Sequence, residues 1–366
     1  DDAGAQIGDG RRNQQRAQGD HQRQPEIFPR HAHYSLDRMA YQTVTMRAMD
    51  SPLFPASKPF DRRAWPMNGR LDFWHARDGW PIRRYRLGDG ARGRLLVING
   101  RGDMIEKYLE LIDHMARRGW AVTAFDWRGQ GGSGRLTDDP LCGHIPDFAD
   151  YITDLRDLAR DWRADGEGPT AMLGHSMGGH MLLRALSEGM TQPDAAILTA
   201  PMLGVHTGPM PRWLAVAVAR MMLWRGLGDR RAWTQKEESE RQRRIRQKRL
   251  THDPERYADE IWWRDHSREI ALGPPSWAWV NQALESTHAL QQDDDLSRVR
   301  CPILILAAQA DQLVSTAAIR RVAARLPNAR LHVYGREAAH EILRELDPVR
   351  RDAFGRIEAF LDEAAR

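Results

Sequence analysis

The sequence predicts an α/β fold: a mostly parallel central sheet with helices on both faces and an inserted helical cap. From about Leu71 onward, short and largely apolar segments alternate with amphipathic ones, a pattern typical of buried parallel strands joined by helices. The alternation stops after Pro201 and resumes at Pro302. The interval between them is helical in composition and holds seven of the chain's 13 tryptophans, so we interpret it as an insertion into the sheet domain.

The predicted strands and helices follow in a regular order. Apolar or alternating residues predict strands at 80–86, 94–98, 121–125, 170–173, 195–200, 302–306 and 331–334. Helices are predicted at 105–118, 147–163 and 177–188, and from residue 316. The last helix is expected to begin at Asp347 and Pro348, because both residue types are favoured at helix N-termini.

This interpretation divides the chain into four segments. Residues 1–35 are mainly polar and charged, and we expect a disordered tail there. The α/β core is predicted at 36–201 and 301–366, and the helical cap at 202–300. The chain has 366 residues, more than the roughly 100–200 of a typical domain, which agrees with one large domain that carries an insertion.

Composition and charge exclude several classes of function. The formal net charge is only +4 at pH 7, so we expect no nucleic-acid partner. Two cysteines cannot form a disulfide framework or a four-thiolate metal site. The apolar run at 213–224 contains Arg220 and is shorter than the roughly 20 residues of a transmembrane helix. The N-terminal residues lack the pattern of a secretory signal, so we expect a cytoplasmic protein.

The residues Gly174-His175-Ser176-Met177-Gly178 form a G-x-S-x-G motif after an apolar strand and before a helix. In this context the motif predicts a nucleophile elbow, in which the serine occupies a strained turn that exposes its hydroxyl. The glycines allow the strand and the helix to approach closely. We predict that Ser176 is a catalytic nucleophile, and the alternative is a turn that serves packing alone.

A serine hydroxyl requires a base that removes its proton and a carboxylate that orients the base. After a nucleophile elbow these residues follow in the order serine, acid, histidine. Asp311 follows the strand at 302–306, and His340 lies between the last strand and the last helix, so we predict that both form a triad with Ser176. The alternatives are Asp347 or one of residues 293–295 as the acid, with a capping role for Asp311, and a structural role for His340.

Acyl transfer also requires two backbone N–H groups that stabilise the negative oxygen of the tetrahedral intermediate. The N–H of Met177, directly after the nucleophile, is predicted to be one donor of this oxyanion hole. The glycine-rich loop at 99–103 follows the strand at 94–98, and we predict that Arg101 supplies the second N–H. The alternative is an ordinary glycine-rich turn.

Two matches to the G-x-G-x-x-G fingerprint of dinucleotide sites occur in the chain. The match at 88–93 precedes its strand, and the match at 129–134 is not followed by a helix, whereas a dinucleotide site requires both a strand before and a helix after. We therefore expect no nucleotide cofactor. The predicted chemistry also requires no metal ion and no organic cofactor.

Six segments together resemble the α/β-hydrolase superfamily, and within it the lysophospholipase L2 and monoacylglycerol lipase branch. They are 125–135, 143–148, 173–179, 198–204, 250–253 and 340–343. The resemblance implies a serine hydrolase that cleaves the carboxylic ester of lysophospholipids through an acyl-enzyme, with Ser176, His340 and Asp311 as its triad. The sequence departs from monoacylglycerol lipases at Asn99-Gly100, where they carry His-Gly.

Three alternatives to a lysophospholipase remain: a monoacylglycerol lipase, a hydrolase of small soluble esters or peptides, and a non-catalytic binding protein on the same fold. The cap bears on this choice, because residues 229–249 include nine basic and four acidic residues. One hypothesis is that this segment and the apolar helix at 213–224 make peripheral contact with anionic lipid at the inner face of the membrane. The alternative is a solvated helix whose tryptophans fill the interior of the cap.

Overall fold

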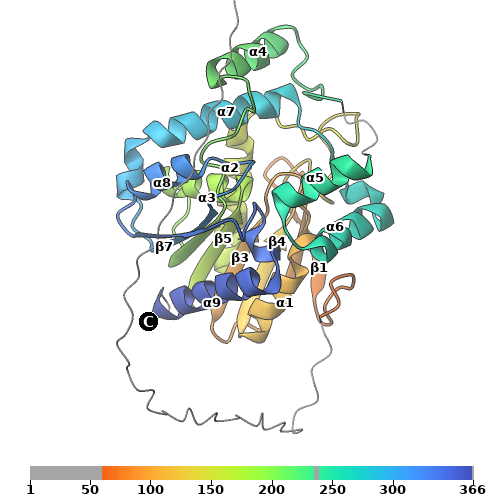
Figure 1. Cartoon of the computed structure of the whole chain (residues 1–366). Coiled ribbons are helices and arrows are strands. Elements are labelled where there is room, and N and C mark those ends of the chain that lie inside the picture. The colour runs from red at the N-terminus through yellow and green to blue at the C-terminus, as the bar shows by residue number, and fades with distance from the viewer. Residues whose placement is uncertain (1–59, 235–238, 365–366) are drawn as a thin grey trace, which may run out of the picture. The chain divides into compact units, whose positions relative to one another are not determined.

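The computed structural model describes residues 60–234 and 239–364, so the predicted tail at 1–35 lies outside the described residues. Within them the central element is an eight-stranded sheet (Figure 1). Its strands are β1 (Arg70–His75), β2 (Pro81–Leu87), β3 (Gly93–Ile98), β4 (Trp120–Phe125), β5 (Thr170–His175), β6 (Ala195–Thr199), β7 (Ile303–Ala308) and β8 (Ala329–Tyr334). The spatial order is β1-β2-β4-β3-β5-β6-β7-β8. Neighbours from β4 to β8 are parallel, and β1 and β2 are antiparallel, which confirms the predicted fold class.

Helices cover both faces of the sheet (Figure 1). The helices α1 (Leu109–Arg117) and α9 (Asp347–Ala364) lie on one face, and α2 (Phe148–Ala164), α3 (Met177–Ser187) and α8 (Thr316–Ala323) lie on the other. In α2 the residues Phe148, Leu155 and Trp162 are buried at seven-residue spacing, which places one apolar stripe against the sheet. Asp147 caps this helix by accepting a hydrogen bond from the N–H of Ala149.

Strand β1 is the main difference from the predicted order of elements. It pairs antiparallel with β2 at the edge of the sheet, with Trp74 opposite Ile82. Its side chains are only partly buried, and Leu71 and Phe73 are exposed, so the sequence lacks the apolar run of an interior strand. The predicted helix at 105–118 also divides, since a 3-10 turn, η1 (Ile105–Tyr108), precedes α1.

The interval between β6 and β7 contains helices and no strand within its described residues. These are α4 (Arg212–Trp224), α5 (Glu240–Leu250), α6 (Pro254–His266), η2 (Arg268–Ile270), α7 (Trp277–Gln292) and η3 (Asp294–Arg298). Helix α7 contacts the sheet domain, because the Oε1 of Gln282 accepts a hydrogen bond from the N–H of Phe148, and α4 lies beyond α7 (Figure 1). We keep the name cap for residues 202–300, and its boundaries as a domain stay a prediction. Among the described residues, no helix has the length and hydropathy needed to cross a bilayer.

A buried carboxylate organises the loops at the carboxyl edge of the sheet. Asp126, directly after β4, accepts hydrogen bonds from the N–H groups of Ile105 and Gly132 and from the guanidinium of Arg83. Gly131 passes so close that a Cβ there would lie 2.3 Å from Asp126 Cγ, and its φ is +48°. Gly131 therefore serves this close packing.

Candidate active site

Ser176 lies in a strained turn between the central strand β5 and helix α3. Its backbone angles, φ 51° and ψ −116°, are unusual for a residue other than glycine. A Cβ on Gly178 would lie 2.2 Å from the carbonyl oxygen of Ile98, and a Cβ on Gly174 would lie 2.7 Å from that of Gly178. Both positions therefore require glycine, and the turn has the geometry of a nucleophile elbow.

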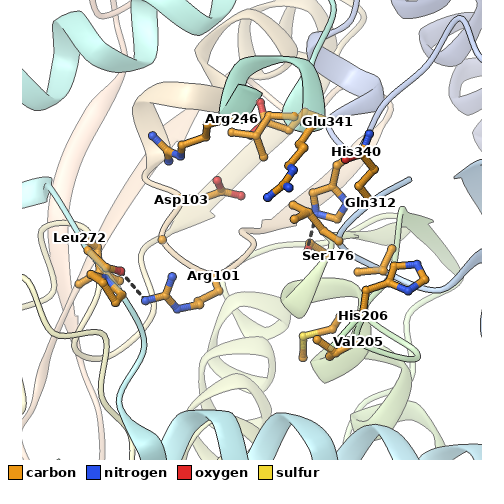
Figure 2. A pocket seen from close by; sticks show the side chains of 18 of the residues that line it. Arg101, Asp103, Ser176, Val205, His206, Arg246, Leu272, Gln312, His340 and Glu341 are labelled. Carbon is orange, nitrogen blue, oxygen red and sulfur yellow. Dashed lines mark hydrogen bonds between the residues drawn. The ribbon is translucent and has the colours of Figure 1, made fainter. Parts of the chain in front are cut away.

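His340 lies within hydrogen-bond distance of both other predicted triad residues. The Nε2 of His340 is 2.9 Å from Ser176 Oγ (Figure 2). The Nδ1 of His340 is 2.7 Å from Asp311 Oδ2. The other oxygen of Asp311 accepts from the N–H groups of Leu313 and Val314 at 2.8 and 3.0 Å. The strand order β5-β6-β7-β8 explains this convergence, because neighbouring parallel strands end at the same edge of the sheet.

The carboxylates considered as alternatives to Asp311 make other interactions. Asp347 pairs with Arg256, and Asp293 accepts a hydrogen bond from the N–H of Asp295 at the start of η3. Asp311 is the carboxylate that contacts the imidazole of His340. The structure thus brings together Ser176, His340 and Asp311, and their catalytic roles stay a prediction.

The interaction between His340 and Asp311 shifts their pKa values in the directions that suit a general base and its partner. Burial opposes charge on His340, but the carboxylate of Asp311 outweighs burial through its charge and hydrogen bond, so the pKa of His340 is raised. Burial likewise opposes charge on Asp311, and the charge of His340, its hydrogen bond and two backbone N–H groups together lower the pKa of Asp311. The pair therefore favours an ionised aspartate that stabilises an imidazolium.

The two predicted oxyanion donors flank the nucleophile. Met177 is the first residue of α3, and Arg101 follows Gly100 in the turn after β3. Gly100 lies against the elbow, since a Cβ there would be 3.2 Å from Ser176 Cβ. Neither Met177 nor Arg101 donates its backbone N–H to another described residue. Asn99, which stands where monoacylglycerol lipases carry histidine, is buried and donates its amide to Asp126 at 3.3 Å.

A cavity of about 870 Å³ contains Ser176 and His340 in its wall (Figure 2). Its wall combines the sheet domain with the cap, which contributes apolar residues such as Ile245 and Leu272. Several charged residues also line it: Arg101, Asp103, Lys107, Arg246, Arg249, Glu260, Arg264 and Glu341. The volume lies within the roughly 300–1,000 Å³ of small-molecule sites, and the mixed lining suits a substrate with both apolar and polar parts.

A buried ion cluster beside the triad was missed by the sequence analysis. The Nζ of Lys107 lies 2.6 Å from Glu341 Oε1 and 3.2 Å from Glu260 Oε2, and it also pairs with Asp103. Burial opposes the charge on Lys107, but the three carboxylates raise its pKa. Since these residues are far apart in the chain and every type is common on protein surfaces, no local pattern could have indicated their contact.

His175, directly before the nucleophile, was also not predicted as part of the site. Its ring centroid lies 4.9 Å from that of His340, and its Nδ1 contacts the carbonyl oxygen of Thr199 at 3.1 Å. Burial, and after it the charge of His340, lower the pKa of His175 to about 4. His175 is therefore neutral at pH 7 and does not compete with His340 for a proton.

Comparisons with known proteins agree with the predicted family and fold. The family model described as "Serine aminopeptidase, S33" matches residues 89–347. Lysophospholipase L2 of Escherichia coli K12 is 30% identical over 339 residues, covering 85% of this chain and 96% of that protein. The probable lysophospholipase L2 of Haemophilus influenzae is 28% identical over 277 residues, covering 74% of this chain and 84% of that protein.

Solved structures show the same fold at lower identity. A soluble variant of monoglyceride lipase from Saccharomyces cerevisiae, in complex with a substrate analog, aligns with a TM-score of 0.65 at 20% identity. The alignment covers 84% of this chain and 98% of that one. The matched range 89–347 includes Ser176, Asp311 and His340. The chain therefore belongs to the Serine aminopeptidase S33 family of α/β-hydrolases and is a carboxylic ester hydrolase.

Proposed function

We propose that the chain is a lysophospholipase that cleaves its substrate through an acyl-enzyme on Ser176. The observation that carries this proposal is the hydrogen-bonded chain from Ser176 through His340 to Asp311, in which Ser176 and His340 line a large cavity. The curated relatives at 28–30% identity carry the name lysophospholipase L2. Their similarity supports this substrate class over a soluble ester or peptide.

In the proposed mechanism, Ser176 Oγ attacks the ester carbonyl while His340 Nε2 takes the hydroxyl proton. The carbonyl electron pair moves to the oxygen, where the N–H groups of Met177 and Arg101 stabilise the negative charge. As the tetrahedral intermediate collapses, the C–O bond to the glycerophospho-alcohol breaks and His340 returns the proton to the leaving oxygen. Water then repeats these steps on the acyl-enzyme and releases the fatty acid, while Asp311 holds the imidazole tautomer throughout.

A side-by-side assay tests the substrate class. Lysophosphatidylcholines and monoacylglycerols of matched acyl length are compared by kcat/KM, with a short-chain p-nitrophenyl ester as the third substrate. We expect lysophospholipid to be preferred and Ser176→Ala to abolish all three activities. A preference for monoacylglycerol or for the short ester would instead establish one of the alternative esterase functions. Absence of labelling of Ser176 by a fluorophosphonate probe would indicate a non-catalytic protein.

We further propose that α4 brings this cytoplasmic enzyme into peripheral contact with the inner face of the membrane. Trp213 and Trp224 are 71% and 84% exposed, and Met221 is 43% exposed. Met221 and Trp224 are eight and eleven positions after Trp213, so the three residues share one stripe of the helix. Ala219 is the buried residue of α4. An exposed stripe of large apolar side chains is typical of a helix that lies in the lipid interface.

The exposure of Trp213, Trp224 and Trp233 argues against the alternative in which the tryptophans fill the cap, although Trp263 and Trp279 are buried. Liposome co-sedimentation across a salt series tests the contact. We expect binding to anionic vesicles that weakens as salt rises, because the exposed basic residues of α5 contribute charge attraction. Absent or salt-insensitive binding would contradict the proposal.

A further inference from the structure

One part of the active-site cavity holds a positive charge that no carboxylate of the described residues neutralises. The guanidinium of Arg101 makes a single hydrogen bond there, from Nη2 to the carbonyl oxygen of Gly273 at 2.5 Å. Its Nε is buried and has no acceptor among the described residues. Its Nη1 likewise makes no hydrogen bond to them. A guanidinium carries five N–H donors and no acceptor, so most of this group's hydrogen-bonding capacity is unused.

A second unused donor lies beside Arg101. The Cζ of Arg101 is 5.4 Å from the centroid of the Trp279 ring, and Trp279 Nε1 is buried without an acceptor among residues 60–234 and 239–364. Both residues line the cavity that contains Ser176. Buried polar groups are almost always satisfied in native proteins. Two unsatisfied donors together, with no carboxylate of the described residues paired to either, indicate a site for the oxygens of an anionic ligand.

The carboxylates of the cavity wall are engaged elsewhere. Asp103, Glu260 and Glu341 all pair with Lys107. Burial lowers the pKa of Arg101 to about 10, so the guanidinium is still charged at pH 7. The binding of an anion would compensate this charge.

The position of Arg101 relative to the nucleophile indicates which anion. Arg101 follows Gly100, which packs against Ser176, and its side chain extends away from Ser176 toward Leu272 (Figure 2). An ester bound at Ser176 therefore has a cationic, donor-rich wall on one side. In a lysophospholipid, the glycerol backbone separates the ester from the phosphodiester by only a few bonds.

We propose that Arg101 and Trp279 Nε1 bind the phosphodiester of the lysophospholipid leaving group, so that the side chain of Arg101 determines headgroup specificity. This inference rests on the proposed lysophospholipase function. A planar guanidinium can donate to two phosphate oxygens at once, and the indole N–H supplies a further donor. A monoacylglycerol has no phosphate and gains nothing from these groups.

The first test is a specificity ratio. We compare kcat/KM for lysophosphatidylcholine with that for monoacylglycerol of the same acyl chain in the wild type, Arg101→Gln and Trp279→Phe. We expect the ratio to fall by about tenfold or more in R101Q, the effect of losing a charge-assisted contact, and by a smaller factor in W279F. The control is Arg243→Gln, an exposed residue of α5 outside the cavity wall, which should keep the wild-type ratio. An unchanged ratio in R101Q would overturn the proposal.

The second test measures headgroup binding without lysophospholipid turnover. Glycerophosphocholine is assayed as a competitive inhibitor of p-nitrophenyl ester cleavage, with glycerol and inorganic phosphate as comparison inhibitors. We expect the diester to inhibit the wild type and to lose about tenfold in affinity in R101Q. Absence of inhibition in the wild type would refute the subsite, and inhibition by inorganic phosphate alone would assign it to free anions.

The two tests also separate this inference from the proposed function. If the wild type cleaves only monoacylglycerol, the lysophospholipase function fails, and the inhibition assay still decides whether Arg101 binds a phosphodiester. A merely structural role, in which Arg101 fastens the cap through Gly273, would lower the thermal midpoint and all activities together. It would not change the ratio between a charged and a neutral substrate. If R101Q does not fold, W279F and Arg101→Lys provide the same comparison. Arg101→Lys keeps the positive charge but loses the planar set of N–H donors of the guanidinium.

Discussion

The Nζ of Lys107 lies 2.6 Å from the Oε1 of Glu341, and Glu341 directly follows His340 in the chain. Because Lys107 belongs to the turn after β3 and also pairs with Glu260 of cap helix α6, one buried ammonium joins three parts of the chain. Glu341 also pairs with Arg344 of η4 (Ile342–Arg344). The loop that carries His340 is thus fixed by charge as well as by packing.

Replacement of Lys107 by Met should destabilise the protein strongly. Removing one partner of a buried ion cluster leaves its carboxylates uncompensated, which costs about 3–5 kcal/mol. The free energy of unfolding is measured by urea denaturation. Lys248→Met, at an exposed position of α5, is the control and should change stability by less than about 0.5 kcal/mol. Equal stability of the two variants would contradict a structural role for the cluster.

The pH dependence should report the coupling between His340 and Asp311. His340 accepts a proton only when neutral, and Asp311 raises the pKa of His340, so kcat/KM should rise with pH to a plateau, with a midpoint above the ordinary value of about 6.5. In Asp311→Asn the imidazolium loses its partner. The midpoint should then move to lower pH, and kcat should fall by about 10⁴-fold, as in serine hydrolases that lose this acid.

Asp347→Asn, at the alternative acid, is the control for this profile. Asp347 pairs with Arg256 on α6, so its substitution should leave the midpoint where it is in the wild type. If D347N moved the midpoint and D311N did not, the assignment of the acid would be reversed.

Gly178→Ala should disrupt the nucleophile elbow. The new Cβ would lie 2.2 Å from Ile98 O and 2.5 Å from Asn99 O, and because both are backbone atoms the strand and helix must separate. We expect loss of activity together with a lower thermal midpoint. Gly355→Ala in α9 is the matched control, since no atom of the described residues, apart from its chain neighbours and the adjacent backbone of its own helix, lies within 4 Å of the new Cβ, and it should stabilise the helix by up to about 1 kcal/mol. Full activity in G178A would contradict the packing argument.

The double variant Trp213→Ala/Trp224→Ala should weaken binding to anionic vesicles and leave turnover of a water-soluble ester intact. Each indole removed takes a large apolar surface from the exposed stripe of α4. Co-sedimentation and ester cleavage are measured on the same preparation. Phe73→Ala on β1, an exposed aromatic residue of the sheet edge that is 52% exposed, is the control. Equal loss of binding in both variants would show a non-specific apolar effect.

The sequence analysis predicted the interior of the sheet domain well and its edge poorly. Interior strands such as β5 and β7 are buried at every residue, so their apolar runs are visible in the sequence. Strand β1 has one solvated face and escaped prediction. The prediction of Ser176, Asp311 and His340 relied on a motif and on the order of residues along the chain.

Local sequence was enough to predict the inner strands of the sheet, the elbow at Ser176 and the two strand ends after which Asp311 and His340 lie, because backbone preference and apolar periodicity act over a few residues. Which charges meet depends on how the whole chain folds. The pairing of Lys107 with Glu260 and Glu341, and the position of Arg101 beside Trp279, depend on distances across the whole fold. A chain with 54 basic and 50 acidic residues offers too many combinations for local patterns to select among them.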